Sequence, residues 1–132
     1  MKNTPKITAA SLALALALAL LSGCATSPSF SQLVGERYFV TNIDTYPLVI
    51  AAVDGSSSTI STKFVEPGMR QLVLQGPPGA AGIPPVLDFA LDVKPCTRYY
   101  IVAVKASPLD NNFTPRVDHE MLLSSHCKLA AS

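Results

Sequence analysis

The stretch LDFALDVKPCTRYYIVAVK, residues 87–105, decides the fold that we expect for this chain. Apolar residues alternate with polar or small residues over 87–94, which is the period-two pattern of a strand with one buried and one wet face. A turn centred on Cys96 follows, and the run 98–105 is apolar on both faces between charged ends. We interpret the two runs as a β-hairpin with Cys96 at its bend.

Other segments of the chain are also rich in strand-forming residues. We predict further strands over 37–42, 48–53, 60–65, 70–75 and, supplied by two pieces, 117–123 and 124–129. The segment 48–53 is apolar on both faces, which suits a buried central strand. It stops at Asp54-Gly55, a strong hairpin-turn signal. Pro67 and Gly68 stand in the order that a type II turn requires.

Two long loops interrupt the strands. Residues 76–85 contain four prolines and three glycines, which cannot hold a hydrogen-bonded ladder, so we expect an exposed, mobile loop. Residues 107–115 form the second loop, with Phe113 presented as an aromatic tip. Loops on a rigid scaffold often carry binding functions. The alternative is that both loops are only tolerated excursions of the chain.

About seven short strands with turn signals between them indicate an all-β chain, a small antiparallel β-sandwich. A small closed barrel is the competing architecture. The only helical candidate is 117–123, which is too short to favour a helix over a strand.

The N-terminus has a different character. Lys2 and Lys6 precede an apolar run over 7–21, and the segment ends in Leu-Ser-Gly-Cys at Cys24. This arrangement resembles a bacterial lipoprotein signal peptide, whose lipobox reads Leu-(Ala/Ser)-(Gly/Ala)-Cys. The resemblance implies cleavage after Gly23, a diacylglycerol on the Cys24 sulfur and acylation of its new amino group. The expected partner of Cys24 is therefore the lipid bilayer, since two or three acyl chains hold a protein firmly there.

Two other kinds of N-terminal segment have a similar apolar run. An uncleaved transmembrane helix needs about 20 apolar residues, more than 7–21 supplies. An ordinary secretory signal would leave Cys24 incidental. The lysines keep the start of the segment cytoplasmic, so the mature chain emerges on the far side. Ala25 stands where an aspartate would retain an enteric lipoprotein in the inner membrane, which favours the periplasmic side of the outer membrane in a Gram-negative host.

The expected organisation is a signal peptide at 1–23, a flexible tether at 24–35 and a β-sandwich domain at 36–132. Cleavage leaves 109 residues and lowers the formal net charge from +1 to −1, because Lys2 and Lys6 are lost. A near-neutral domain without a basic stripe excludes nucleic acid as a partner. The chain has no tryptophan, so a platform for stacking sugars or bases is not expected.

The remaining cysteines are Cys96 and Cys127. In an oxidising compartment, a disulfide between them is the default. The alternative is a redox pair or a pair of metal ligands. Redox pairs usually follow the spacing Cys-x-x-Cys, which these residues do not have.

Two segments carry further resemblances. The turn 54–55 with the later run VEPGMRQLVL, residues 65–74, resembles a PEGA-type β module. The run CTRYYIVA, residues 96–103, with Glu120 and Cys127 downstream, is similar to small bacterial lipoproteins of no assigned activity. These resemblances imply a surface-tethered β-sandwich and carry over no catalytic residues.

The densest polar cluster is Asp118-His119-Glu120, followed by His126-Cys127. A metal site would use His119, Glu120 and His126, but a seven-residue histidine spacing matches no common zinc pattern. We expect no metal and no cofactor.

Two enzyme classes were also considered. The serines at 56–58 lack a Gly-x-Ser-x-Gly elbow and a nearby base. Asp88 and Asp92 lie roughly 13 Å apart along one strand, too far for a glycosidase pair. We expect a non-enzymatic envelope lipoprotein, an accessory or structural component that binds another envelope protein through loops or a sheet edge. The alternative is a small-ligand or glycan-binding module on the envelope.

Overall fold

The computed structural model describes residues 29–123 and Cys127. The expected signal peptide 1–23 and Cys24 lie outside these residues. The described part is built from strands β1 (Ser31–Val34), β2 (Thr45–Tyr46), β3 (Val49–Val53), β4 (Ser56–Ser57), β5 (Lys63–Val65), β6 (Gly68–Gln75), β7 (Val86–Val93), β8 (Thr97–Val104) and β9 (Thr114–Leu122). Over the described range, no helix has the length and apolar character that crossing a membrane requires.

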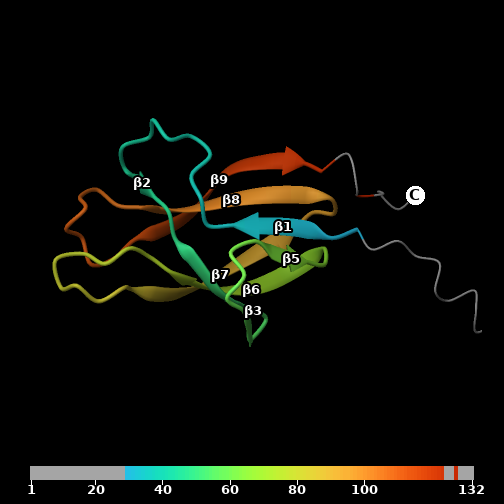
Figure 1. Cartoon of the computed structure of the whole chain (residues 1–132), viewed down its shortest axis with the longest axis horizontal. Coiled ribbons are helices and arrows are strands. Elements are labelled where there is room, and N and C mark those ends of the chain that lie inside the picture. The colour runs from blue at the N-terminus through green and yellow to red at the C-terminus, as the bar shows by residue number, and fades with distance from the viewer. Residues whose placement is uncertain (1–28, 124–126, 128–132) are drawn as a thin grey trace, which may run out of the picture.

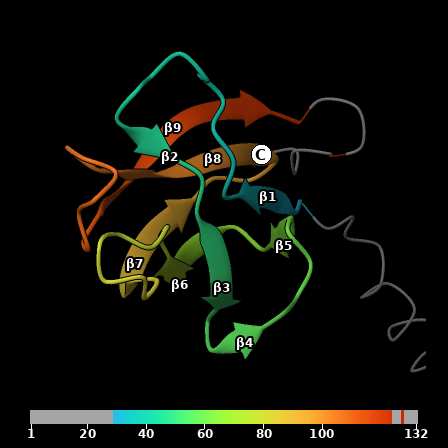
Figure 2. The same cartoon turned by 60° about the vertical axis from the view of Figure 1, so that its left-hand side comes forward.

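The strands form two sheets, as expected for a sandwich (Figure 1, Figure 2). In sheet A, β8 pairs with β9 on one side. On its other side β8 pairs with β1 in parallel and, further along, with β2, and β5 extends the sheet beyond β1. Sheet B has the order β4-β3-β6-β7 and is antiparallel throughout.

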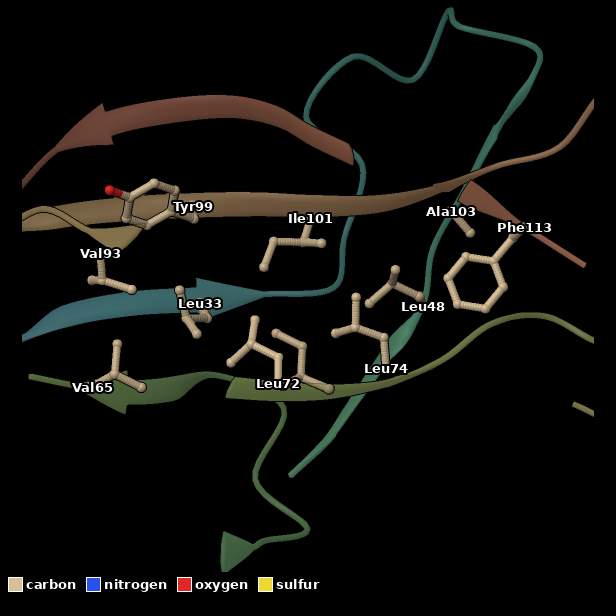
Figure 3. Packing of buried hydrophobic residues seen from close by; sticks show 11 residues of the cluster. Leu33, Leu48, Val65, Leu72, Leu74, Val93, Tyr99, Ile101, Ala103 and Phe113 are labelled. Atoms are coloured by element: carbon tan, nitrogen blue, oxygen red, sulfur yellow. The ribbon is translucent and has the colours of Figure 1, made fainter. Parts of the chain in front are cut away.

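The core lies between the two sheets. Figure 3 shows side chains of β6 in sheet B pointing toward side chains of β1 and β8 in sheet A. The buried cluster comprises Leu33, Leu48, Ile50, Val65, Leu72, Leu74, Val93, Tyr99, Ile101, Ala103 and Phe113. The strand predicted at 70–75 is confirmed within β6, where Leu72 and Leu74 share the buried face. The strand predicted at 117–123 is confirmed as part of β9, whereas 124–126 and 128–129 lie outside the described residues.

The hairpin predicted over 87–105 is wrong, although both strands exist. The alternation is confirmed in β7, where Leu87, Phe89, Leu91 and Val93 face the core. However, β7 pairs with β6 in sheet B, and β8 belongs to sheet A. The wet face of β7 lies on the open outer side of sheet B, whereas β8 is largely buried on both faces and lies inside sheet A. The turn after β7 therefore crosses from one sheet to the other.

The boundary of the expected tether is also corrected. Ser31–Val34, assigned to the flexible segment 24–35, form β1, and Leu33 is completely buried. Their burial between β5 and β8 stabilises an extended conformation that their small and polar neighbours obscure in the sequence. The folded part thus begins before residue 36.

Two strands predicted in the N-terminal half of the chain differ from the observed structure. Residues 37–42 form no strand but belong to the irregular segment 35–44, which lies on the outer face of sheet A. Its Tyr38 and Phe39 make aromatic contacts with side chains of β8 and β9 and do not pair with a strand. The strand expected at 60–65 is shorter, because only Lys63–Val65 pair with β1. In β3, only Ile50 is fully buried, since the outer face of sheet B is open.

The two long loops pack against each other, contrary to the expected mobile loop and aromatic tip. The Ala80 nitrogen donates a 2.9 Å hydrogen bond to the Leu109 carbonyl, and the Ala81 nitrogen donates one of 2.9 Å to Asn111 Oδ1. Phe113 is only 8% exposed and joins the core beneath Gly76. Burying this ring removes more apolar area from water than presenting it would.

Candidate functional site

A disulfide joins Cys96 and Cys127, whose Cα atoms lie 5.5 Å apart. Cys96 sits in the β7–β8 turn, is 1% exposed and has a φ of 53°, in the left-handed region. Its carbonyl accepts a 2.7 Å hydrogen bond from the Leu123 nitrogen. The disulfide therefore fastens the chain after β9 to this turn. Neither cysteine is a free thiol.

The polar cluster at 118–120 begins with a carboxylate that holds a loop. The register of β8 and β9 shifts between Tyr100 and Ile101, which leaves Asp118 as the extra residue of a β-bulge. Its side chain is 3% exposed. Oδ1 accepts a 3.2 Å hydrogen bond from Arg116 Nη2, and Oδ2 accepts one of 3.3 Å from the Phe39 nitrogen. Asp118 thus attaches the segment 35–44 to β9.

His119 and Glu120 turn to different partners. The His119 ring stacks on Tyr38, with centroids 3.8 Å apart and planes inclined by 16°, and Tyr38 also meets Tyr100 at 5.0 Å. Glu120 pairs with Lys94, Nζ to Oε2 3.0 Å. The predicted candidate His126 lies outside the described residues. Within residues 29–123 and Cys127, no group of three or more histidine, cysteine and acidic side chains is placed to hold a metal.

Two exposed charges have shifted pKa values. The pKa of Asp54 is lowered, first by the hydrogen bond from the Gln71 main chain and then by Arg70. The pKa of Lys94 is raised by its hydrogen bond to Glu120. In each case the charged form is the favoured one at neutral pH, so these are structural pairs and not proton-transfer groups.

A cleft of about 420 Å³ lies beside β5 and the β3–β4 turn. Its lining includes Ser56, Ser58 and Lys63, together with Arg70 and two acidic side chains. Lys63 is only 7% exposed, and its Nζ donates to the Ser58 carbonyl. The lining contains no histidine, so neither serine has a neighbouring imidazole base. The lining also contains Val53, Ile60, Phe64 and Val65, so the cleft offers polar and apolar contacts but no pair of nucleophile and imidazole base.

Among the strands of the described fold that are open along one edge, β7 is the longest without a bulge. All eight residues of β7 pair with β6 without a bulge, and no other strand in the described part of the chain lies on its far side. The Gly76 nitrogen donates a 2.9 Å hydrogen bond to the Pro85 carbonyl, which fixes the alternation of the ladder. Because hydrogen-bonded and non-hydrogen-bonded pairs alternate, the main-chain groups of Val86, Asp88, Ala90 and Asp92 point toward the open edge.

Sequence reasoning found the strand β7 but missed its edge position. Two other features were also missed: the buried Lys63 and the stack of Tyr38 on His119. The alternation of β7 is local and visible in the sequence, whereas the edge position depends on which strands pair. Tyr38 and His119 lie 81 residues apart in the sequence, so no local signal links them.

Comparison with protein-family models, curated proteins and solved structures finds no match for this chain. Function is therefore inferred from the residues and geometry described above.

Proposed function

We propose that the protein is a lipid-anchored accessory component of a bacterial envelope, without enzymatic activity, that binds another envelope protein through the open edge of β7. The anchor rests on the lipobox-like segment ending at Cys24. The binding role rests on one observation, the eight-residue edge of β7 that no described strand pairs. Proteins usually protect such an edge with proline, lysine or a bulge.

The edge of β7 lacks all three, and its only charges are the aspartates Asp88 and Asp92. Its sequence, VLDFALDV, contains no proline and no lysine, and its register with β6 is continuous. A partner strand would take up the outward main-chain groups and extend sheet B, as in β-augmentation. Asp88 and Asp92 lie exposed on the outer face of the sheet. The matching partner strand therefore carries lysine or arginine at positions that face these aspartates.

The polar clusters favour binding over catalysis. Asp118 and His119 are engaged by Phe39 and Tyr38, and Glu120 is paired with Lys94. Each side chain of the cluster 118–120 thus has a structural partner. A catalytic site instead needs such groups to converge on one point.

The test is photo-crosslinking in intact cells, with a photoreactive phenylalanine analogue at Asp88 and, separately, at Ile83 in the loop 76–85. We expect one dominant crosslinked protein from position 88, retained when Ala90 is changed to Val and lost in Ala90→Pro. Proline removes an outward N–H but no bond to β6, and valine keeps the N–H. Crosslinking from position 83 alone would transfer the binding role to the loop.

A second candidate function is supported by the cleft at Lys63, a buried cation beside main-chain and hydroxyl groups. It would serve a small polar ligand. A thermal-shift screen with sugars and organic acids tests this alternative, and a stabilisation lost in Lys63→Met would favour it over the β7 edge.

A further inference from the structure

The N-terminal end of the described chain defines one end of the sandwich. β1 starts at this end, and β5 and β9 end there. The turn that carries Cys96 lies at the same end (Figure 1). The loops 76–85 and 105–113 lie at the opposite end. Phe30 is six residues from Cys24, and a fully extended chain spans at most about 3.6 Å per residue. An acylated Cys24 thus keeps this end within about 22 Å of the bilayer surface.

The outer face of sheet A is covered over only half of its length. Toward the far end, Tyr38 and Phe39 lie over Tyr100 and His119, and Val102 on the same face is completely buried. Toward the N-terminal end, no described segment covers the face in this way. The strand register places Phe64, Gln32, Arg98 and Met121 in one row across β5, β1, β8 and β9.

This row is amphipathic. Phe64 is 64% exposed at one end and Met121 is 38% exposed at the other, while Phe30, just before β1, is 39% exposed. The Arg98 guanidinium lies between them, 5.2 Å from the Tyr100 ring centroid, and forms no ion pair with the acidic groups of the described residues. Its Nε is buried and has no hydrogen-bond partner there.

We infer that this row is a membrane-contact surface, which lays the uncovered half of sheet A on the lipid bilayer to which Cys24 is anchored. Phe64, Met121 and Phe30 would enter the boundary between headgroups and acyl chains, as the apolar faces of interfacial segments do. Arg98 would meet lipid phosphates, for which a guanidinium has matching donors. The occupant is a lipid surface and not a protein, because the short connection to Cys24 holds the row near the bilayer.

The inference rests on the proposed lipid anchor. It also gives the β7 edge an orientation: with sheet A against the membrane, sheet B is the layer that faces away from it. A partner strand would then reach β7 without displacing lipid.

The chain has no tryptophan, so a single introduced tryptophan reports its own surroundings. We would purify the anchored protein carrying Phe64→Trp and reconstitute it in vesicles of phosphatidylethanolamine and phosphatidylglycerol with brominated acyl chains. Matched variants are Ile83→Trp at the far end and Met69→Trp near the same end on sheet B, with wild-type side-chain exposures of 74% and 61%. Vesicle flotation is measured on every sample.

We expect the tryptophan at position 64 to show a blue-shifted emission that the brominated lipids quench strongly. The tryptophans at positions 69 and 83 should emit almost equally in vesicles with and without bromine. Arg98→Gln should weaken the quenching at position 64 only when phosphatidylglycerol is present, since the cation favours anionic headgroups. Flotation with equal, weak quenching at all three positions would overturn the membrane-contact surface but leave the anchor intact. Quenching at position 69 but not at position 64 would mean that sheet B lies on the membrane, and would overturn the proposed orientation of the sandwich. Failure to float would overturn the proposed anchor itself.

Discussion

Arg70 Nη1 donates a 2.9 Å hydrogen bond to Asp54 Oδ2 and so connects two turns of the chain. Asp54 begins the β3–β4 turn, and its Oδ1 also accepts a 2.9 Å bond from the Gln71 nitrogen. Arg70 further donates to the carbonyls of Glu66 and Pro67 in the β5–β6 turn. One carboxylate and one guanidinium thus tie the two turns to each other.

The first prediction concerns pH. The folded-state pKa of Asp54 is lowered from its ordinary value of 3.8, so the ionised side chain stabilises the fold. This contribution is complete above the unfolded-state pKa and is lost as the pH falls through the lower folded-state pKa. Asp54→Asn should therefore have a lower melting temperature than the wild type at neutral pH, and the gap should close in acid. Thermal unfolding followed by circular dichroism over pH measures this.

Asp88→Asn is the matched control for this experiment. Asp88 is exposed, with no hydrogen bond or salt bridge from its side chain in the described structure. Its substitution should leave the melting temperature nearly unchanged at every pH. An Asp54→Asn gap that stays constant into acid would contradict the stabilising role of the charge.

The second prediction concerns Ser31. Its Oγ donates to the Lys94 carbonyl and accepts a 3.0 Å hydrogen bond from the Thr97 nitrogen, and the residue is completely buried. Ser31→Ala should lower the free energy of unfolding by about 1–3 kcal/mol, because the buried Thr97 nitrogen and the part-buried Lys94 carbonyl lose a partner. Urea unfolding measures the loss. Ser57→Ala, the same change at an exposed site, should stay within about 0.5 kcal/mol of wild type. Equal losses in both variants would contradict the proposed role of the Ser31 hydroxyl.

The features that the sequence predicts correctly are local ones. The Asp54-Gly55 turn has positive φ at both residues, 48° and 80°, as a two-residue hairpin turn requires. Gly68, which follows Pro67 and begins β6, also has a positive φ, 114°. The alternation in β7 and the shared face of Leu72 and Leu74 are confirmed as well. Each of these signals is contained in a few neighbouring residues.

The errors concern relations between distant segments. The sequence predicts a hairpin bend at Pro95-Cys96, but alternation cannot show whether two strands share a sheet or face each other across a core. Phe113 was placed on a loop tip because its neighbours are polar, yet Gly76, 37 residues earlier, leaves space for its ring. The segment 35–44 was misassigned for the same reason, since its packing depends on His119 and Tyr100.

The third prediction concerns the disulfide. Cys96→Ser and Cys127→Ser should each cost about 3–4 kcal/mol in the chain-entropy model for a closed loop of this size, and the double variant should cost little more than either single one. Denaturant unfolding of the three variants tests this. Additive losses would show that the two residues act independently.

Cys96 provides a finer comparison, because its φ of 53° is one that glycine adopts without strain. Cys96→Gly should be more stable than Cys96→Ser by about 1 kcal/mol, since both lose the bond but only glycine relieves the left-handed conformation. Equal stability of the two variants would contradict strain at this turn.

The fourth prediction concerns the contact that joins the two long loops to the core. A Cβ atom added at Gly76 would lie 2.4 Å from Phe113 Cδ1, too close for the ring to keep its place. Gly76→Ala should therefore cost about 1–3 kcal/mol, the usual effect of overpacking. Phe113→Leu should also destabilise the protein by leaving a void, but the double variant should lose clearly less than the two single losses combined, because the smaller leucine makes room for the added methyl group. A double-mutant cycle measured by urea unfolding decides the matter, and simple additivity would mean that the loop moves away from Phe113 instead of straining against it.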